Sequence, residues 1–240
     1  MKKNIFRIII LCFFLGGTSV FLFYKGYLRL NYPSEKEFPV KGIDISHHQK
    51  NIDWQKLKSE NLSFVFIKAT EGGDFVDPDF KNNWQNAKAS GYTIGAYHFY
   101  RICKSSLEQS ENLIRVVPND SGSLPPVIDL EFGGNCKTEK TREQITFEMR
   151  DLVQRIKEHY GQFPILYSTN EFYKEYLIKD FDDCPIWIRD INSKPSLAEN
   201  RKWTFWQYAN KGHLNGIEGF VDLNVFNGSK EEFKKLLGGS

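Results

Sequence analysis

The sequence has almost no excess of charge of either sign and contains no run of like charges. Its 32 lysines and arginines are nearly balanced by 30 aspartates and glutamates, which leaves a net charge of +2. A basic surface of the kind that binds nucleic acid is therefore not expected. The chain also lacks a Gly-x-Ser-x-Gly elbow, a P-loop and a dinucleotide-binding glycine pattern. These absences argue against a serine triad and a nucleotide-dependent reaction, and no cofactor is predicted.

Cysteine is scarce, with 4 residues in the chain and no Cys-x-x-Cys spacing. A zinc ribbon is therefore not supported, and no metal site is predicted. Cys103, Cys136 and Cys184 follow the N-terminal segment, so one of them stays unpaired if a disulfide forms. Cys103 and Cys136 each follow a predicted strand and could pair in an exported domain, whereas the alternative is three reduced thiols.

A long apolar run occupies the N-terminus. Lys2, Lys3 and Arg7 precede an uncharged run over residues 8–24, a pattern that is typical of a secretory signal or a signal-anchor. Apolar residues resume after the small residues in mid-run and no Ala-x-Ala site follows, so the sequence favours an uncleaved membrane anchor within residues 1–30. The positive charges before the run place the rest of the chain outside the cytoplasm, or make it secreted if the segment is cleaved.

Residues 31–40 form a polar stretch with two prolines, which is typical of a linker. Short apolar runs then alternate with helical patterns, and Asp77 and Thr141 are predicted N-caps of two helices. Eight of the runs are strand candidates, at residues 42–46, 62–68, 93–100, 126–131, 164–168, 185–189, 202–208 and 219–223. This alternation predicts parallel strands with helical crossovers. Because the last three strands are too close in sequence for full helices between them, we expect an α/β barrel with helices on about five connections.

The sharpest motif is the segment PPVIDLE at residues 125–131. Side chains alternate along a strand, so Asp129 and Glu131 share one face and Leu130 points to the other. Glycoside hydrolysis needs such a pair, one carboxylic acid to protonate the leaving oxygen and one carboxylate to stabilise or attack the sugar. Like charges held close also raise a pKa, which suits the acid. For this motif alone, a solvated strand end and a Ca²⁺ or Mg²⁺ site stay open as alternatives.

Other strand ends carry polar or aromatic groups as well. Asp44 lies near the end of the first candidate strand and Asp222 near the end of the last. Tyr97 and Phe99 share one face of the third strand, and residues 203–208 have an unusual aromatic load. Barrel enzymes place their chemistry at the C-terminal ends of their strands, so we expect these groups to surround one site.

Together these segments resemble the glycoside hydrolase family 25 lysozymes, the Chalaropsis-type muramidases. The matching stretches follow the family's order and cover about residues 41–226: GIDISHHQ, IDW, FVFIKATEGG, D-x-x-F, GAYHFY, PPVIDLE, PILYS, PIWI, FWQY and GFVDLNVF. The resemblance implies an α/β fold with a flattened TIM-like barrel of eight strands and about five helices, over residues 41–240. It also implies a lysozyme that hydrolyses the β-1,4 bond between N-acetylmuramic acid and N-acetylglucosamine in the glycan strands of peptidoglycan. We expect the protein to be a monomer.

The resemblance also assigns roles to residues. Glu131 matches the family's proton donor, Asp129 its partner carboxylate, and Asp44 and Asp222 two further acids of the cleft. The residues predicted to bind substrate are Tyr97, Phe99, Tyr167, Trp187, Trp206 and Gln207. Displacement by a nucleophile, inversion through a water and assistance by the acetamido oxygen of the substrate all stay open. We expect Glu131 to act as acid and base, with Asp129 positioning the acetamido group or stabilising developing positive charge.

One departure from the family pattern affects the rim of the cleft. Many relatives carry a small residue and then a tyrosine after the Trp-Ile of the sixth strand, whereas this chain has Arg189 and Asp190.

Two other functions are compatible with the same barrel. A glycan-binding module without activity is disfavoured by the presence of both Asp129 and Glu131. A hydrolase of another N-acetylglucosamine polymer, such as chitin, is disfavoured because residues 125–128 do not fit the longer acidic motif of the family 18 chitinases.

Overall fold

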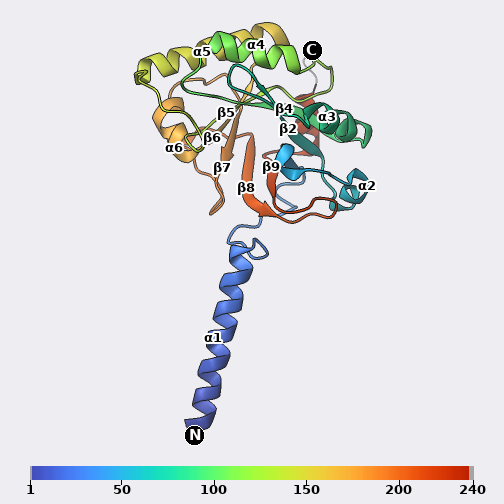
Figure 1. The fold of residues 1–240 in the computed structure, drawn as a ribbon, viewed down its shortest axis with the longest axis vertical. Helices are drawn as coiled ribbons and strands as arrows, with labels where there is room; N and C mark the ends of the chain where they lie inside the picture. The colour runs from blue at the N-terminus through green and yellow to red at the C-terminus, as the bar shows by residue number, and fades with distance from the viewer. Residues whose placement is uncertain (1, 238–240) are drawn as a thin grey trace.

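The computed structural model describes residues 2–237, which form a closed barrel and an N-terminal helix that extends away from it (Figure 1). The strands are β1 (Lys41–Ile45), β2 (Phe64–Glu71), β3 (Phe75–Val76), β4 (Thr93–Phe99), β5 (Val127–Leu130), β6 (Ile165–Thr169), β7 (Ile186–Arg189), β8 (Phe205–Gly212) and β9 (Val221–Phe226). Eight of them close a ring in the order β1-β2-β4-β5-β6-β7-β8-β9, while the short β3 pairs only with β2. The predicted eight-stranded α/β barrel is confirmed.

The strands of the ring are parallel from β1 through β8, and β9 alone runs antiparallel to both of its neighbours. A parallel crossover needs a dozen or more residues, usually with a helix. The segment between β8 and β9 is too short for one, so the chain turns back directly. The expectation of parallel strands therefore holds for all but the last.

The α-helices of the described chain lie around the barrel, except for the first, which extends away from it (Figure 1). They are α1 (Lys2–Tyr24), α2 (Trp54–Leu57), α3 (Phe80–Ala89), α4 (Ser106–Val116), α5 (Arg142–Tyr160), α6 (Asn170–Phe172) and α7 (Lys230–Lys235). The α5 helix begins as predicted, because the Thr141 hydroxyl accepts from the Gln144 backbone in a capping box, and it ends at Gly161 in the left-handed region. The predicted N-cap at Asp77 is wrong, since α3 begins at Phe80 and the Asp77 carboxylate accepts instead from the backbone of His47 and Asp79.

Aromatic rings fill the inside of the barrel. The interior cluster is dominated by Phe64, Phe66, Tyr167, Trp187, Phe205, Phe226 and Phe233. The Phe66 and Trp187 rings stack with centroids 4.5 Å apart, and Phe205 lies edge-on to Phe66 at 5.3 Å. Many of the aromatic residues in the sequence therefore belong to this cluster, which forms an aromatic floor beneath the mouth of the barrel.

A second, larger core lies between the barrel and its helices. Strand alternation sends Leu130, Leu166, Ile186 and Ile188 outward into this layer. Among its helical members are Leu113 of α4 and Met149, Leu152 and Ile156 of α5. The two clusters pack against opposite faces of the barrel wall, so the side chains at the strand ends start from a rigid frame.

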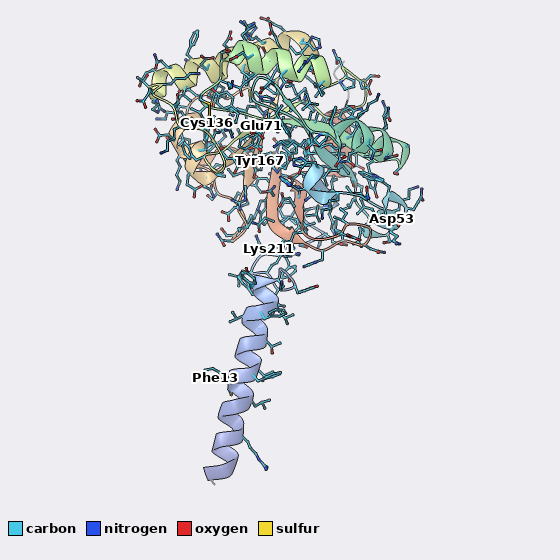
Figure 2. The ribbon with its side chains drawn as sticks, viewed as in Figure 1. Phe13, Asp53, Glu71, Cys136, Tyr167 and Lys211 are labelled. Carbon is cyan, nitrogen blue, oxygen red and sulfur yellow. A yellow bond between two sulfur atoms is a disulfide. The ribbon has the colours of Figure 1, made fainter. Side chains whose placement is uncertain are left out.

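The segment before β1 contacts the barrel although it contains no helix or strand between Tyr24 and Lys41. The Asn31 amide donates to the Tyr208 carbonyl over 3.0 Å, and the buried Phe38 ring packs against Trp203 and Trp206. Lys211 lies where α1 meets the barrel and donates to the Tyr24 carbonyl over 3.0 Å (Figure 2). Among the described residues, none of the helices combines the length and apolar character that crossing a membrane requires. The membrane anchor within residues 1–30 stays a prediction from the sequence.

Gly95 on β4 leaves the space that the Phe66 ring occupies. A Cβ atom at this position would lie 2.6 Å from two atoms of that ring and 3.1 Å from Leu124. We expect Gly95→Ala to lower the free energy of unfolding by about 1–3 kcal/mol, because the ring must move within a packed interior. Urea titration measures this change.

The double variant Gly95→Ala/Phe66→Leu is the control for this prediction. If the clash is with the ring, the two changes are non-additive and the smaller leucine recovers part of the lost stability. Additive losses would show that the cost of Gly95→Ala arises elsewhere.

Candidate active site

A pocket of about 110 Å³ opens at the C-terminal ends of the parallel strands, above the aromatic floor. Its lining residues are Asp44, Tyr97, Asp129, Glu131, Tyr167, Trp187, Gln207 and Asp222. All four acids predicted from the sequence meet here, together with four of the six predicted substrate-binding residues. Tyr167 marks the place of the pocket within the barrel (Figure 2).

Strand register explains why these side chains converge. Asp129 of β5 pairs with Tyr167 of β6, which pairs with Trp187 of β7, so all three point inward at one level. Glu131 follows one step later on the same face of the chain, while Leu130 between them is buried in the outer core. The predicted alternation within the PPVIDLE segment is thus confirmed.

Asp44 and Asp222 face each other across the antiparallel pair of β1 and β9. The Asp44 Oδ2 atom accepts from the Gln207 amide over 2.9 Å and from the Asn224 amide over 2.7 Å, and the two carboxyl groups share a hydrogen bond. Burial raises the pKa of Asp44, while the hydrogen bonds from Asn224 and Gln207 act in the opposite direction. Burial and the adjacent Asp44 raise the pKa of Asp222 to about 9. At neutral pH Asp222 therefore holds a proton, and the two amide donors favour the ionised form of Asp44 over that of Asp222.

Two aromatic donors orient the amides that hold Asp44. The Tyr167 hydroxyl donates to Gln207 Oε1 over 3.0 Å, and the Trp187 indole N–H donates to Asn224 Oδ1 over 2.9 Å. With its oxygen engaged, each amide must turn its NH₂ group toward Asp44. Asn224 was not predicted as a site residue. Its position two residues after Asp222 on β9 could have pointed to a place in the site. Its role in holding Asp44, however, depends on a tryptophan of another strand.

Asp129 and Glu131 lie in a poorly solvated environment. Burial, followed by the nearby Glu131, raises the pKa of Asp129 well above its ordinary value. Its Oδ1 atom is buried and has no hydrogen-bond partner among residues 2–237. Burial also raises the pKa of Glu131, although the positive charge of Arg189 acts against the shift. Each carboxyl group is thereby biased toward its protonated form.

Phe99 and Trp206 are not among the residues that line the pocket. Phe99 lies at the end of β4, where its ring and that of Phe75 flank the Lys68 ammonium at 5.2 and 5.5 Å. Trp206 belongs to the outer core, because its neighbours Phe205 and Gln207 take the inward positions on β8. Its indole N–H donates to the Asp190 carbonyl over 2.8 Å. Residues 203–208 place aromatic side chains on both faces of the strand, so the sequence did not show which of them point inward.

The loop that follows Glu131 is held by the loop that follows β4. The Asn135 amide donates to the Glu131 carbonyl over 3.0 Å and to the Tyr100 carbonyl over 2.8 Å. Cys103 and Cys136 form a disulfide between the two loops, which is the pairing that the sequence left open. These links fix the backbone on the far side of Glu131.

His47 serves as a structural contact beside the pocket. Its Nδ1 atom lies 2.7 Å from a carboxylate oxygen of the buried Asp77, and the ring of His48 lies beside it. Across the described part of the chain, no three histidine, cysteine or acidic side chains are grouped as metal ligands would be.

The sequence model of Glycosyl hydrolases family 25 matches residues 43–217, which include three of the four clustered acids. The chain belongs to glycosyl hydrolase family 25. It is accordingly a glycosidase, and its pocket of carboxyl groups is the natural place for that chemistry.

Relatives in family 25 cover most of the chain. Lysozyme M1 of Streptomyces globisporus is 34% identical over 202 residues, which cover 79% of this chain and 68% of that protein. The uncharacterized protein YegX of Escherichia coli is 33% identical over 207 residues, covering 84% and 75% of the two chains. A family 25 glycosyl hydrolase from Bacillus anthracis has a solved structure that superposes with a TM-score of 0.81 at 42% identity, covering 87% of this chain and 97% of that one.

The acid cluster of this family 25 barrel should reduce stability as the pH rises. The folded pKa of Asp222 is about 9 rather than 3.8, so between these values the folded state holds a proton that the unfolded chain releases. The free energy of unfolding then falls with rising pH. Asp222→Asn keeps a donor toward Asp44 and removes this titration. We expect it to stabilise the protein at pH 8 by on the order of 2 kcal/mol, with little effect near pH 4.

Denaturant unfolding at both pH values measures this difference. Asp183→Asn, at an exposed position, is the control and should change neither value. If Asp222→Asn is no more stable than the wild type at pH 8, folded Asp222 does not hold the proton assigned to it.

Proposed function

We propose that this chain is a lysozyme, an N-acetylmuramidase that hydrolyses the β-1,4 bond between N-acetylmuramic acid and N-acetylglucosamine in peptidoglycan. The observation that carries the proposal is the convergence of four carboxyl groups in one pocket at the mouth of the barrel. Two relatives support the substrate class, since they are named Lysozyme M1 and, in Clostridium acetobutylicum, Autolytic lysozyme.

In this proposal Glu131 is the general acid and base. It is less deeply buried than Asp129 and lies at the edge of the strand, where a glycosidic oxygen can reach it. Its raised pKa favours the protonated form that a general acid requires. Glu131 transfers that proton to the leaving sugar oxygen as the bond to the anomeric carbon breaks. It then takes a proton from the water whose hydroxyl group completes the muramic acid product.

Asp129 is proposed to position the acetamido group of the bound muramic acid. Its buried Oδ1 atom has no partner in the described chain, and a buried polar atom without a partner is costly unless a ligand satisfies it. The acetamido N–H donates to this atom and aligns the acetamido oxygen with the anomeric carbon. Positive charge that develops on the sugar is then stabilised by the partial negative charge of the same oxygen atom.

Asp44 supplies fixed negative charge to the same site. Its carboxylate is held by Gln207 and Asn224, and these amides are held in turn by Tyr167 and Trp187. Because the group is oriented before the substrate binds, it stabilises an oxocarbenium-like transition state without reorganisation. Asp222 contributes by holding the proton that keeps this pair singly charged.

We further propose that the barrel, over residues 41–240, acts outside the cytoplasm. Its substrate lies there, and the N-terminal residues 1–30 carry the basic and apolar pattern of an export signal. Retention of this segment as a membrane anchor stays a prediction from the sequence, as do the linker over residues 31–40 and the monomeric state.

Glu131→Gln should lower the rate of peptidoglycan hydrolysis by about 10²–10⁴-fold, because an amide cannot supply the proton. Mass spectrometry of fragments released from purified peptidoglycan measures it, and wild-type products should carry N-acetylmuramic acid at the reducing end. The exposed Glu158→Gln on α5 is the control and should cleave normally. Full activity in Glu131→Gln would refute the assignment.

Asp129→Asn should also lose most of the activity, because the amide can turn its NH₂ group toward the acetamido N–H and cannot ionise when positive charge develops on the sugar. The same fragment assay, run as a time course, gives kcat and KM for this variant. A rate near that of the wild type would transfer the role to Asp44 or Asp222.

A further inference from the structure

Arg189 occupies an inward position at the rim of the pocket. It ends β7 and follows Trp187 on the same face of the strand. In the sheet register it lies level with Thr169 of β6 and Gln207 of β8. Because Leu130 pairs with Ser168, Glu131 falls on this same level one strand further round. The guanidinium therefore extends from the row of side chains that includes the proposed acid.

The positive charges around the pocket are of two kinds. Lys68 is engaged, because its ammonium donates to Glu71 over 2.8 Å and is flanked by the rings of Phe75 and Phe99. Arg189 is half-exposed, and its side chain makes no hydrogen bond or ion pair within residues 2–237. Its charge is nonetheless close enough to lower the pKa of Glu131, Asp44 and Asp222.

This arrangement differs from that of a guanidinium that serves only to neutralise the catalytic acids. Such a group would pair directly with one of them, in the bidentate geometry that arginine and carboxylate favour. Arg189 instead influences three acids from a distance and leaves all of its donors available. A ligand with an anionic group can therefore bind the guanidinium without displacing any contact of the folded protein.

We propose that Arg189 binds a carboxylate of the N-acetylmuramic acid unit and thereby selects this sugar over N-acetylglucosamine. The proposal rests on the function proposed above. The lactyl ether is what distinguishes the two sugars, and its carboxyl group is free in glycan strands without stem peptides. In strands that carry peptides it forms an amide, and the peptide supplies carboxylates of its own. A planar fork of N–H donors fits either source.

Binding of the carboxylate also acts on the chemistry. The bound anion offsets the positive charge that lowers the pKa of Glu131, so the proposed acid holds its proton more firmly when the correct substrate is present. In Arg189→Gln, Glu131 lacks that nearby positive charge both in the free enzyme and in the complex with substrate. The basic limb of the kcat/KM profile should therefore move to higher pH in this variant, because this profile reports the free enzyme.

The test compares three substrates: glycan strands stripped of peptides, the same strands with their lactyl carboxylates converted to methyl amides, and intact peptidoglycan. Arg189→Gln should lower kcat/KM on the stripped strands by about 10- to 100-fold, mainly through KM, and stay near the wild type on the amidated strands. Arg189→Lys should recover part of the loss, since it restores the charge but not the fork. The exposed Arg150→Gln on α5, which pairs with Asp180, is the matched control.

A loss on the stripped strands that is absent from the amidated strands supports the lactyl carboxylate as the ligand. A loss confined to intact peptidoglycan supports the proposal with the stem peptide as the source. Equal losses on all three substrates, or no loss on any, would overturn it. If the wild-type protein releases reducing ends from none of the three substrates, the proposed lysozyme function is contradicted. The proposal for Arg189 then falls with it.

Discussion

The pair of hydrogen bonds that holds the Asp44 carboxyl group is the interaction on which the rest of the site depends. A buried carboxylate is costly unless donors compensate it, and here two amides do so, each locked by an aromatic donor on another strand. The chain of contacts runs through β1, β6, β7, β8 and β9. It therefore forms only when the barrel is closed, and the charge in the pocket is a direct product of the fold.

The local pattern of the sequence was sufficient to predict the strands and the pair of acids at residues 129 and 131. Alternation places Asp129 and Glu131 on one face because Leu130 must be buried, and the capping box at Thr141 locates the start of α5. In each case the decisive neighbours lie within a few residues, where propensity and periodicity are strong. The same reasoning brought Asp44 and Asp222 to strand ends, and the resemblance to family 25 supplied their roles.

What the sequence did not reveal depends on partners far along the chain. His47 contacts Asp77 from 30 residues away, and Asp77 is consequently no helix cap. Asn224 acquires its function from Trp187, 37 residues earlier. Trp206 lies in an aromatic run that offers no polar contrast, so periodicity could not decide which of its rings turn inward. The antiparallel direction of β9 likewise follows from the closure of the ring.

The aromatic floor links stability and chemistry in one layer. Phe66, Trp187 and Phe205 pack against one another beneath the pocket, and this apolar layer strengthens the electrostatic interactions above it. Burial above this layer raises the pKa of Asp129, Glu131 and Asp222, which favours their protonated forms. A more polar floor would relieve the carboxyl groups and would also deprive the site of a protonated acid near neutral pH. The same aromatic packing therefore stabilises the barrel and raises the pKa of the carboxyl groups in its pocket. A change in this packing is expected to affect both.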